Sequence, residues 1–191
     1  RLWNTQTGEL IRSEHCYNSG TACIAFSHDG SLLAFSGNSN SKTAESRIEV
    51  YDVSSWTRHN SIEILEGRAY NLLFQRDDKS LIVLGGECVP LGQESCRPTG
   101  RIWLCGTSSK SAAMPVKDEA QFGYFNYAKL LAGSKQFLVR TDVTQNNRVV
   151  SQLQVRDAST GKLISSIDPE AVADNQGLAG HPGTSRIVTR G

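Results

Sequence analysis

Apolar residues in this chain occur in short segments where they alternate with polar positions. Runs rich in Gly, Ser, Asn and Asp separate these segments. Alternation with a period of two is typical of half-buried β-strands, and the polar runs between are typical of turns. The segments recur in groups of four, so the pattern predicts sheets of four antiparallel strands.

A sequence repeat sets the register of these strands. The opening RLWNTQTGELI returns in degraded form as LQVRDASTGKLI, with Thr7-Gly8 matched by Thr160-Gly161. Two more divergent copies begin at Arg47 and Arg101. The equivalent dipeptides are Trp3-Asn4, Tyr51-Asp52, Cys105-Gly106 and Arg156-Asp157. Their spacing of about 50 residues is the signature of a repeat architecture.

On these residues, and on the segments before them, the chain resembles the WD-repeat β-propeller family. TACIAFSHDGSLLAFSG, from Thr21, looks like the first two strands of that family joined by a tight turn at Asp29-Gly30. The same place in later repeats reads NLLFQRDDKSLIVLGG from Asn71, AKLLAGSKQFLVRT from Ala128 and LAGHPGTSRIVTRG from Leu178. The resemblance therefore covers the whole chain and fades toward its end.

Two features depart from the family pattern. No Gly-His dipeptide precedes a first strand, and only Tyr51-Asp52 approaches the aromatic-Asp form of the terminal dipeptide. The Asp-His-Ser/Thr-Trp hydrogen-bond network of the family cannot be assembled from these residues. Other propeller families built from four-stranded blades stay open.

The resemblance implies an all-β fold, a β-propeller segment of four-stranded antiparallel blades. The expected units are a half-blade at 1–13, blades at 21–65, 68–116 and 123–167, and a half-blade at 176–191. The first half-blade supplies an outer strand pair and the last an inner pair, so pairing them would close a four-bladed ring. We favour instead an arc cut from a larger ring, because the chain opens inside a strand and without Met.

Two long polar segments each lie between the second and third predicted strands of a unit. Residues 36–46 have no apolar periodicity, which predicts an exposed loop. The segment GGECVPLGQESCRPTG, from Gly85 to Gly100, is predicted to leave the sheet because its prolines and glycines disfavour ladder pairing. Cys88 and Cys96 lie in this loop, and free thiols are favoured there over a disulfide or a zinc site.

Composition narrows the classes of partner. Hydrophobic residues make up 38% of the chain and charged residues 20%, as in ordinary globular domains. The net charge of +1 gives no basic face of the kind that nucleic-acid binding uses, so nucleic acid is not favoured, and no apolar run is long enough to span a membrane. Five cysteines without dense pairing fit a reducing compartment, so we expect a cytoplasmic protein, with the nucleus as an alternative.

Candidate chemistry is sparse. The histidines His15, His28, His59 and His181 stand far apart, and no nucleophile elbow, dinucleotide-binding loop or Walker sequence occurs. His28 is interpreted as a solvated turn residue. We assign Trp3, Tyr51 and Trp103 to the packing between blades, and expect Trp56 to be partly exposed in a turn.

The sequence therefore favours a non-catalytic scaffold that binds another protein or peptide and needs no cofactor or metal. By the resemblance, the binding face holds loops 37–46, 86–99 and 142–148, with connectors 14–20, 66–68, 117–122 and 168–176. The candidate contact residues are Tyr17, Arg68, Arg97 and Phe122, because Arg and aromatic side chains are enriched at energetic hot spots. The alternative is an enzyme-type or ligand-binding propeller with its site in the central channel. The rest of a larger propeller is a further candidate partner.

Overall fold

The computed structural model describes residues 1–13, 21–38, 46–64, 67–90, 96–108, 113–116, 125–131, 133, 135–145, 148–167, 178–180 and 187–189. These residues form strands and turns, and no helix among them is long and apolar enough to cross a membrane.

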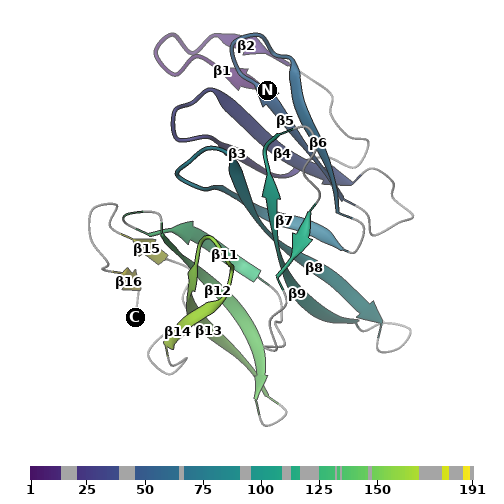
Figure 1. Ribbon diagram of the computed structural model, residues 1–191, viewed down its shortest axis with the longest axis vertical. Helices are drawn as coiled ribbons and strands as arrows, with labels where there is room; N and C mark the ends of the chain where they lie inside the picture. Colours follow the sequence, from purple (N-terminus) through teal and green to yellow (C-terminus); the bar gives the residue numbers. More distant parts are fainter. Residues whose placement is uncertain are drawn as a thin grey trace.

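Three four-stranded antiparallel sheets follow one another along the chain (Figure 1). Blade 1 contains β3 (Thr21–Phe26), β4 (Leu32–Asn38), β5 (Ser46–Asp52) and β6 (Arg58–Ile64). Blade 2 contains β7 (Arg68–Phe74), β8 (Ser80–Pro90), β9 (Cys96–Gly106) and β10 (Met114–Pro115). Blade 3 contains β11 (Phe125–Leu130), β12 (Gln136–Gln145), β13 (Arg148–Asp157) and β14 (Leu163–Ile167). In each blade the strands pair in chain order, as the repeat predicts.

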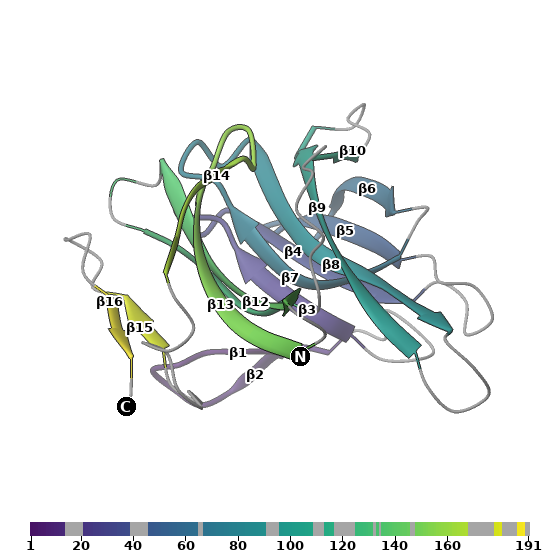
Figure 2. The same cartoon turned by 90° about the horizontal axis from the view of Figure 1, so that it is seen from below.

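Two-stranded sheets lie before and after the three blades. The first contains β1 (Leu2–Trp3) and β2 (Leu10–Arg12), and the last contains β15 (Leu178–Gly180) and β16 (Ile187–Thr189). They are separate sheets, and the two ends of the chain lie far apart along the longest axis (Figure 1). Seen from below, along the longest axis, the strands of the three blades overlap in the view (Figure 2). The described strands thus form an open arc, as favoured above, and do not close a four-bladed ring.

The turns between third and fourth strands confirm the alignment of the repeat. In each of three units a polar residue at the strand end donates its amide to a carbonyl five residues later. These bonds join Asn4 to Glu9, Asp52 to Thr57 and Asp157 to Lys162, at 2.8–2.9 Å. The Asn or Asp side chain then accepts hydrogen bonds from the turn that follows it, an arrangement common in Asx turns. The dipeptides aligned by sequence therefore occupy equivalent places.

The first turn of blade 1 differs from the two-residue turn expected at Asp29-Gly30. The Ser27 amide donates to the Leu32 carbonyl at 2.9 Å, so the loop has four residues, 28–31. Gly30 does take the expected left-handed conformation, with φ +74°. His28 is not simply solvated, because its amide donates to Asp78 Oδ1 at 2.7 Å and its ring Nδ1 lies 3.1 Å from the same oxygen. This turn therefore rests on the corresponding turn of blade 2.

Packing between the blades forms the core. One apolar cluster joins blades 1 and 2 through inward residues such as Val50, Phe74 and Trp103, and a second joins blades 2 and 3. Trp103 is buried and Tyr51 half-buried, as assigned from sequence, and Trp56 is half-buried. The assignment is wrong for Trp3, which is 50% exposed. Among the described residues its sheet has two strands, without the neighbours that bury the equivalent residues in the blades.

The segment between Gly85 and Gly100 also differs from the prediction. Its described part stays in the sheet, because β8 and β9 pair without interruption from Gly86 opposite Gly100 to Pro90 opposite Cys96. β7 starts opposite Gly86, so within the described part of the chain the hairpin beyond that point pairs with no third strand on the β7 side. Prolines are tolerated at such an edge because the proline nitrogen need not donate to a neighbour.

Candidate interaction face

Two hairpins extend beyond the blades that carry them. We call residues 87–90 with 96–99 the β8–β9 ribbon, and residues 142–145 with 148–152 the β12–β13 ribbon. In blade 3, β11 pairs with β12 only as far as Thr141, and β14 pairs with β13 from Leu153 onward. The ladder between β12 and β13 nevertheless continues to Gln145 opposite Arg148. Residues 142–148, expected to be a loop, are therefore largely strand.

Both ribbons lie on the side predicted for binding. In Figure 1 the ends of β8 and β9 point to the lower right and those of β12 and β13 to the bottom, whereas the turns that join β3 to β4 and β7 to β8 lie on the left. Blade 1 has no comparable extension in its described part, because β4 and β5 end together with β3 and β6. Among the described strands, the outer edges of both ribbons pair with no third strand. Such edges are templates for an added strand.

Charged side chains gather at the foot of the β8–β9 ribbon. The Glu87 carboxylate lies 4.0 Å from the Arg101 guanidinium, and both are partly exposed. The Glu87 amide donates to the Thr99 hydroxyl at 3.3 Å, and that hydroxyl is also 3.3 Å from the Glu87 carbonyl, to which it donates. Arg68 is exposed at the start of β7, opposite Gly86. Both signs of charge thus occur at the foot of the ribbon, in the Glu87–Arg101 pair and, on the neighbouring strand β7, in Arg68.

Glycines allow this close arrangement of strands. A Cβ on Gly85 would lie 1.8 Å from the Arg68 carbonyl oxygen, and one on Gly86 would lie 1.6 Å from the Thr99 carbonyl oxygen. Neither position accepts a side chain without moving backbone. The Gly-Gly pair therefore fixes how near β7 and β9 approach β8 at the foot of the ribbon.

A polar network occupies the foot of the β12–β13 ribbon. Arg140 donates to the Ser151 hydroxyl at 3.2 Å, and that hydroxyl donates to the Asp142 carboxylate at 2.6 Å. Asp142 and Ser151 face each other across the ladder. The two ribbons therefore both carry opposite charges at their base, which suits polar recognition more than a uniformly charged ligand.

Only part of the predicted contact set lies within the described residues. Arg68 lies on the predicted face and is exposed. The Arg97 backbone belongs to β9, opposite Val89, and its side chain lies outside the described set. Tyr17 and Phe122 also lie outside it. So do the side chains of Cys88 and Cys96, and their chemical state stays a prediction.

Sequence reasoning missed an inter-blade clamp that stabilises this face. The buried Ser36 hydroxyl donates to the Ala69 carbonyl at 3.3 Å, and the Ala69 amide donates to the buried Ser46 hydroxyl at 3.2 Å. Cys23 lies 2.9 Å from the Ser36 hydroxyl, and burial raises the pKa of its thiol to about 11. Ser36 and Ser46 border a polar segment of the sequence, and serine is common in turns, so neither residue signalled this role.

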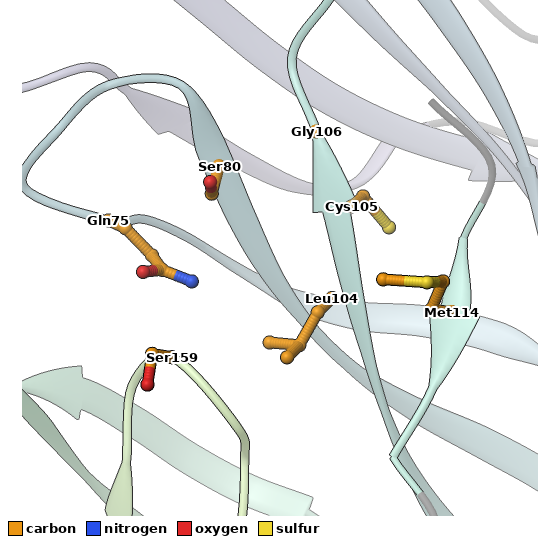
Figure 3. A pocket seen from close by; sticks show the side chains of 7 residues that line it. All are labelled: Gln75, Ser80, Leu104, Cys105, Gly106, Met114 and Ser159. Carbon is orange, nitrogen blue, oxygen red and sulfur yellow. The ribbon is translucent and has the colours of Figure 1, made fainter. Parts of the chain in front are cut away.

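A pocket lies on the opposite side, between blades 2 and 3 (Figure 3). Its volume is 420 Å³, and it is lined by Gln75, Ser80, Leu104, Cys105, Gly106, Met114 and Ser159. The set contains no carboxylate or imidazole, and burial raises the pKa of the Cys105 thiol to about 12, which disfavours a reactive thiolate. Over the described part of the chain, no three His, Cys, Asp or Glu side chains converge as a metal site.

Comparison with solved structures shows the fold. No family model and no curated protein matches the chain. The β-propeller domain of Myceliophteria thermophila Cps50 (Swd1) is similar in structure, with a TM-score of 0.57 at 12% sequence identity. The match covers 87% of this chain and 50% of that one, so the chain spans about half the length of the propeller domain. The expected fold class, a partial β-propeller of four-stranded blades, is confirmed.

Proposed function

We propose that the chain is a divergent WD-repeat-like scaffold that binds an extended segment of another protein or a peptide through its two ribbons. The observation that carries this proposal is the projection of two neighbouring hairpins from one side of the arc, with outer edges that pair with no third strand among the described strands. A strand that adds to such an edge gains main-chain hydrogen bonds, and flanking side chains supply specificity. The coarser role, an interaction scaffold, also agrees with the propeller fold.

Side chains at the ribbon feet suit a partner that carries both signs of charge. Arg68 and the pair of Glu87 with Arg101 flank the first ribbon, and Asp142 lies at the second. Mixed charges at an interface steer encounter and fix register more than they add raw affinity. We therefore assign affinity chiefly to the main-chain edges and selectivity to these side chains.

The enzyme-type alternative receives no comparable support. It needs polar groups that converge on a reacting centre. The pocket of Figure 3 is bordered by apolar, hydroxyl and amide side chains and lies between two blades on the side away from the ribbons. The scaffold is therefore the function that we propose.

We propose that the protein works in a reducing compartment, the cytoplasm or the nucleus. Two free thiols support this, because Cys105 lies within the core of the described blades and the partly buried Cys23 packs against it. A buried thiol is inert as long as it stays reduced, and it cannot pair without local unfolding.

Quantitative affinity purification tests the proposed function. One bait carries Arg68→Glu, and a second has residues 88–98 replaced by an Asn-Gly turn that joins Glu87 to Thr99. The matched control is Lys79→Glu, which inverts an exposed cation in the β7–β8 turn at the far end of the same blade. We expect both ribbon variants to recover about tenfold less, or lower still, of the proteins that the wild type and the control bind. Equal recovery by all four baits would overturn the proposal.

A further inference from the structure

The junction between blades 1 and 2 can be compared, position by position, with the junction between blades 2 and 3. The turns after β9 and β13 occupy the same place in their blades. The amides of Thr107 and Ala158 donate, at 2.8 and 2.9 Å, to the carbonyl of the lysine that precedes the second strand of their own blade. The residues that follow them in the chain, Ser108 and Ser159, are therefore equivalent.

The facing positions on the fourth strands are equivalent as well. Asn60 of β6 pairs with Val50, the residue before the aligned dipeptide of blade 1. Met114 of β10 pairs with Leu104, the residue before the aligned dipeptide of blade 2. Asn60 and Met114 therefore take the same place in successive blades.

One junction is closed at this place and the other is open. The Asn60 side-chain amide donates to the Ser108 carbonyl at 2.7 Å, and Asn60 is only 8% exposed. Met114 carries no N–H or O–H and is 65% exposed. Together with Ser159 it borders the pocket of 420 Å³. The pocket thus lies where, at the neighbouring junction, a carboxamide group makes the contact between the blades.

The lining of the pocket suits a neutral ligand with an apolar body. None of the described residues that line it carries a charge, so a charged ligand would lose water there without gaining a partner of opposite sign. Leu104 and Met114 supply apolar surface, and a methionine sulfur packs favourably against aromatic rings. In Figure 3 the Gln75 side chain points toward Leu104, and its amide can both donate and accept hydrogen bonds.

We propose that this pocket binds a small, neutral aromatic carboxamide. The NH₂ group of the ligand takes the part of the Asn60 amide and donates to the Ser159 carbonyl, while the ligand oxygen accepts from Gln75. The aromatic ring packs on Leu104 and Met114. The volume lies in the range of about 300–1,000 Å³ that is usual for ligand pockets. The proposal does not depend on the ribbon function, because the β7–β8 turn, which contributes to the pocket, lies on the side away from the ribbons (Figure 1).

Benzamide is the probe, and the single methionine of the chain is the reporter. When the methionine methyl group is labelled with ¹³C, its one protein signal comes from Met114 at the pocket. We expect benzamide to shift this signal along a saturable curve. Benzoate has nearly the same size but carries a charge and no N–H, so it should bind at least about tenfold more weakly. Both titrations use the wild type, so neither depends on how a variant folds.

Met114→Asn tests the comparison between the two junctions. The new amide should donate to the Ser159 carbonyl as Asn60 donates to Ser108, and so occupy the site. The dissociation constant of benzamide, measured by saturation transfer, should rise at least about tenfold. Ile164→Asn is the matched control: Ile164 is a 50% exposed apolar residue on the outer strand of blade 3, outside the pocket lining, and the change should leave binding unaltered. The proposal fails if the Met114 signal does not respond to benzamide, if benzoate gives an equal response, or if Met114→Asn binds benzamide as the wild type does.

Discussion

The turns that follow β5 and β13 share a hydrogen-bond pattern but differ in the residue at their fifth position. Asp52 and Asp157 begin them, and the fifth position is Trp56 in one and Gly161 in the other, with φ +55° and +72°. Gly8 holds the same place after β1, with φ +73°. A bulky residue at positive φ is strained, so Trp56 must be held by contacts that a glycine does not need.

Those contacts come from the position before the turn and from β2 of the preceding unit. Tyr51 packs on Trp56 with 5.6 Å between ring centroids, and the Arg12 guanidinium lies 5.2 Å from the Trp56 ring centre. In blade 3 the equivalent of Tyr51 is the fully buried Arg156, which donates to the Gly161 carbonyl at 2.7 Å. In both blades the residue before the turn therefore contacts the fifth residue of the turn. The contact is ring packing in blade 1 and a hydrogen bond in blade 3.

The largest effect is expected at Gly161. A Cβ there would lie 2.6 Å from Val116 Cγ2 in addition to the unfavourable φ, so Gly161→Ala should cost about 2–4 kcal/mol of unfolding free energy. Gly8→Ala is the control, because its φ is the same and no atom lies within 4 Å of the added carbon. It should cost about 1 kcal/mol.

Urea denaturation measures both losses, and a third variant separates their causes. Val116→Ala should recover part of the Gly161→Ala loss, since it removes the side chain that the new carbon meets. Equal losses at Gly8 and Gly161 would mean that blade packing does not distinguish the two turns.

Gly30, in the turn between β3 and β4, gives a smaller test of the same contrast between glycine and a residue with a side chain at positive φ. Gly30 has φ +74° with no atom within 4 Å of an added Cβ, and Asp78 takes the equivalent place in blade 2 with φ +53°. Gly30→Val should therefore lower stability by about 1–3 kcal/mol through backbone strain alone. Gly30→Asp should cost less than about 1 kcal/mol, because Asp tolerates this conformation. A thermal melting midpoint equal to that of the wild type for Gly30→Val would show that the strain is absent.

Much of the fold could be predicted from the sequence, because alternation and the repeat report local structure. The blade order and the equivalence of Asp52 with Asp157 follow from those patterns. The ribbons could not be predicted. Glycine and proline between Gly85 and Gly100 normally end a strand, and they are compatible with this hairpin because it pairs with no third strand among the described residues.

The exposure of side chains at the ends of the arc could not be predicted either. Trp3 has the pattern of a core residue, and its exposure follows from the two-stranded sheet that holds it among the described residues, which no local pattern shows. The Ser36 and Ser46 clamp likewise depends on how blade 2 meets blade 1. Within the candidate face, Arg68 could be selected by residue type and position. The pairing of Glu87 with Arg101 could be identified only from the strand register.

The smallest expected effect is a pH dependence that separates Asp52 from Asn4, which fills the same position in an uncharged form. The Ser54 hydroxyl, followed by the Ser55 amide and hydroxyl, lowers the pKa of Asp52 to about 2. A carboxylate with a lowered pKa in the folded state stabilises the fold above its ordinary pKa near 4, and that contribution disappears as the pH falls through about 2. Asp52→Asn keeps an oxygen able to accept the Ser55 amide, as the Asn4 side chain does for Gln6. The melting temperature of the wild type should therefore exceed that of Asp52→Asn near pH 5, and the difference should shrink steadily between about pH 4 and pH 2. A difference that stays constant over this range would show that the ionisation of Asp52 does not contribute to the stability of the turn.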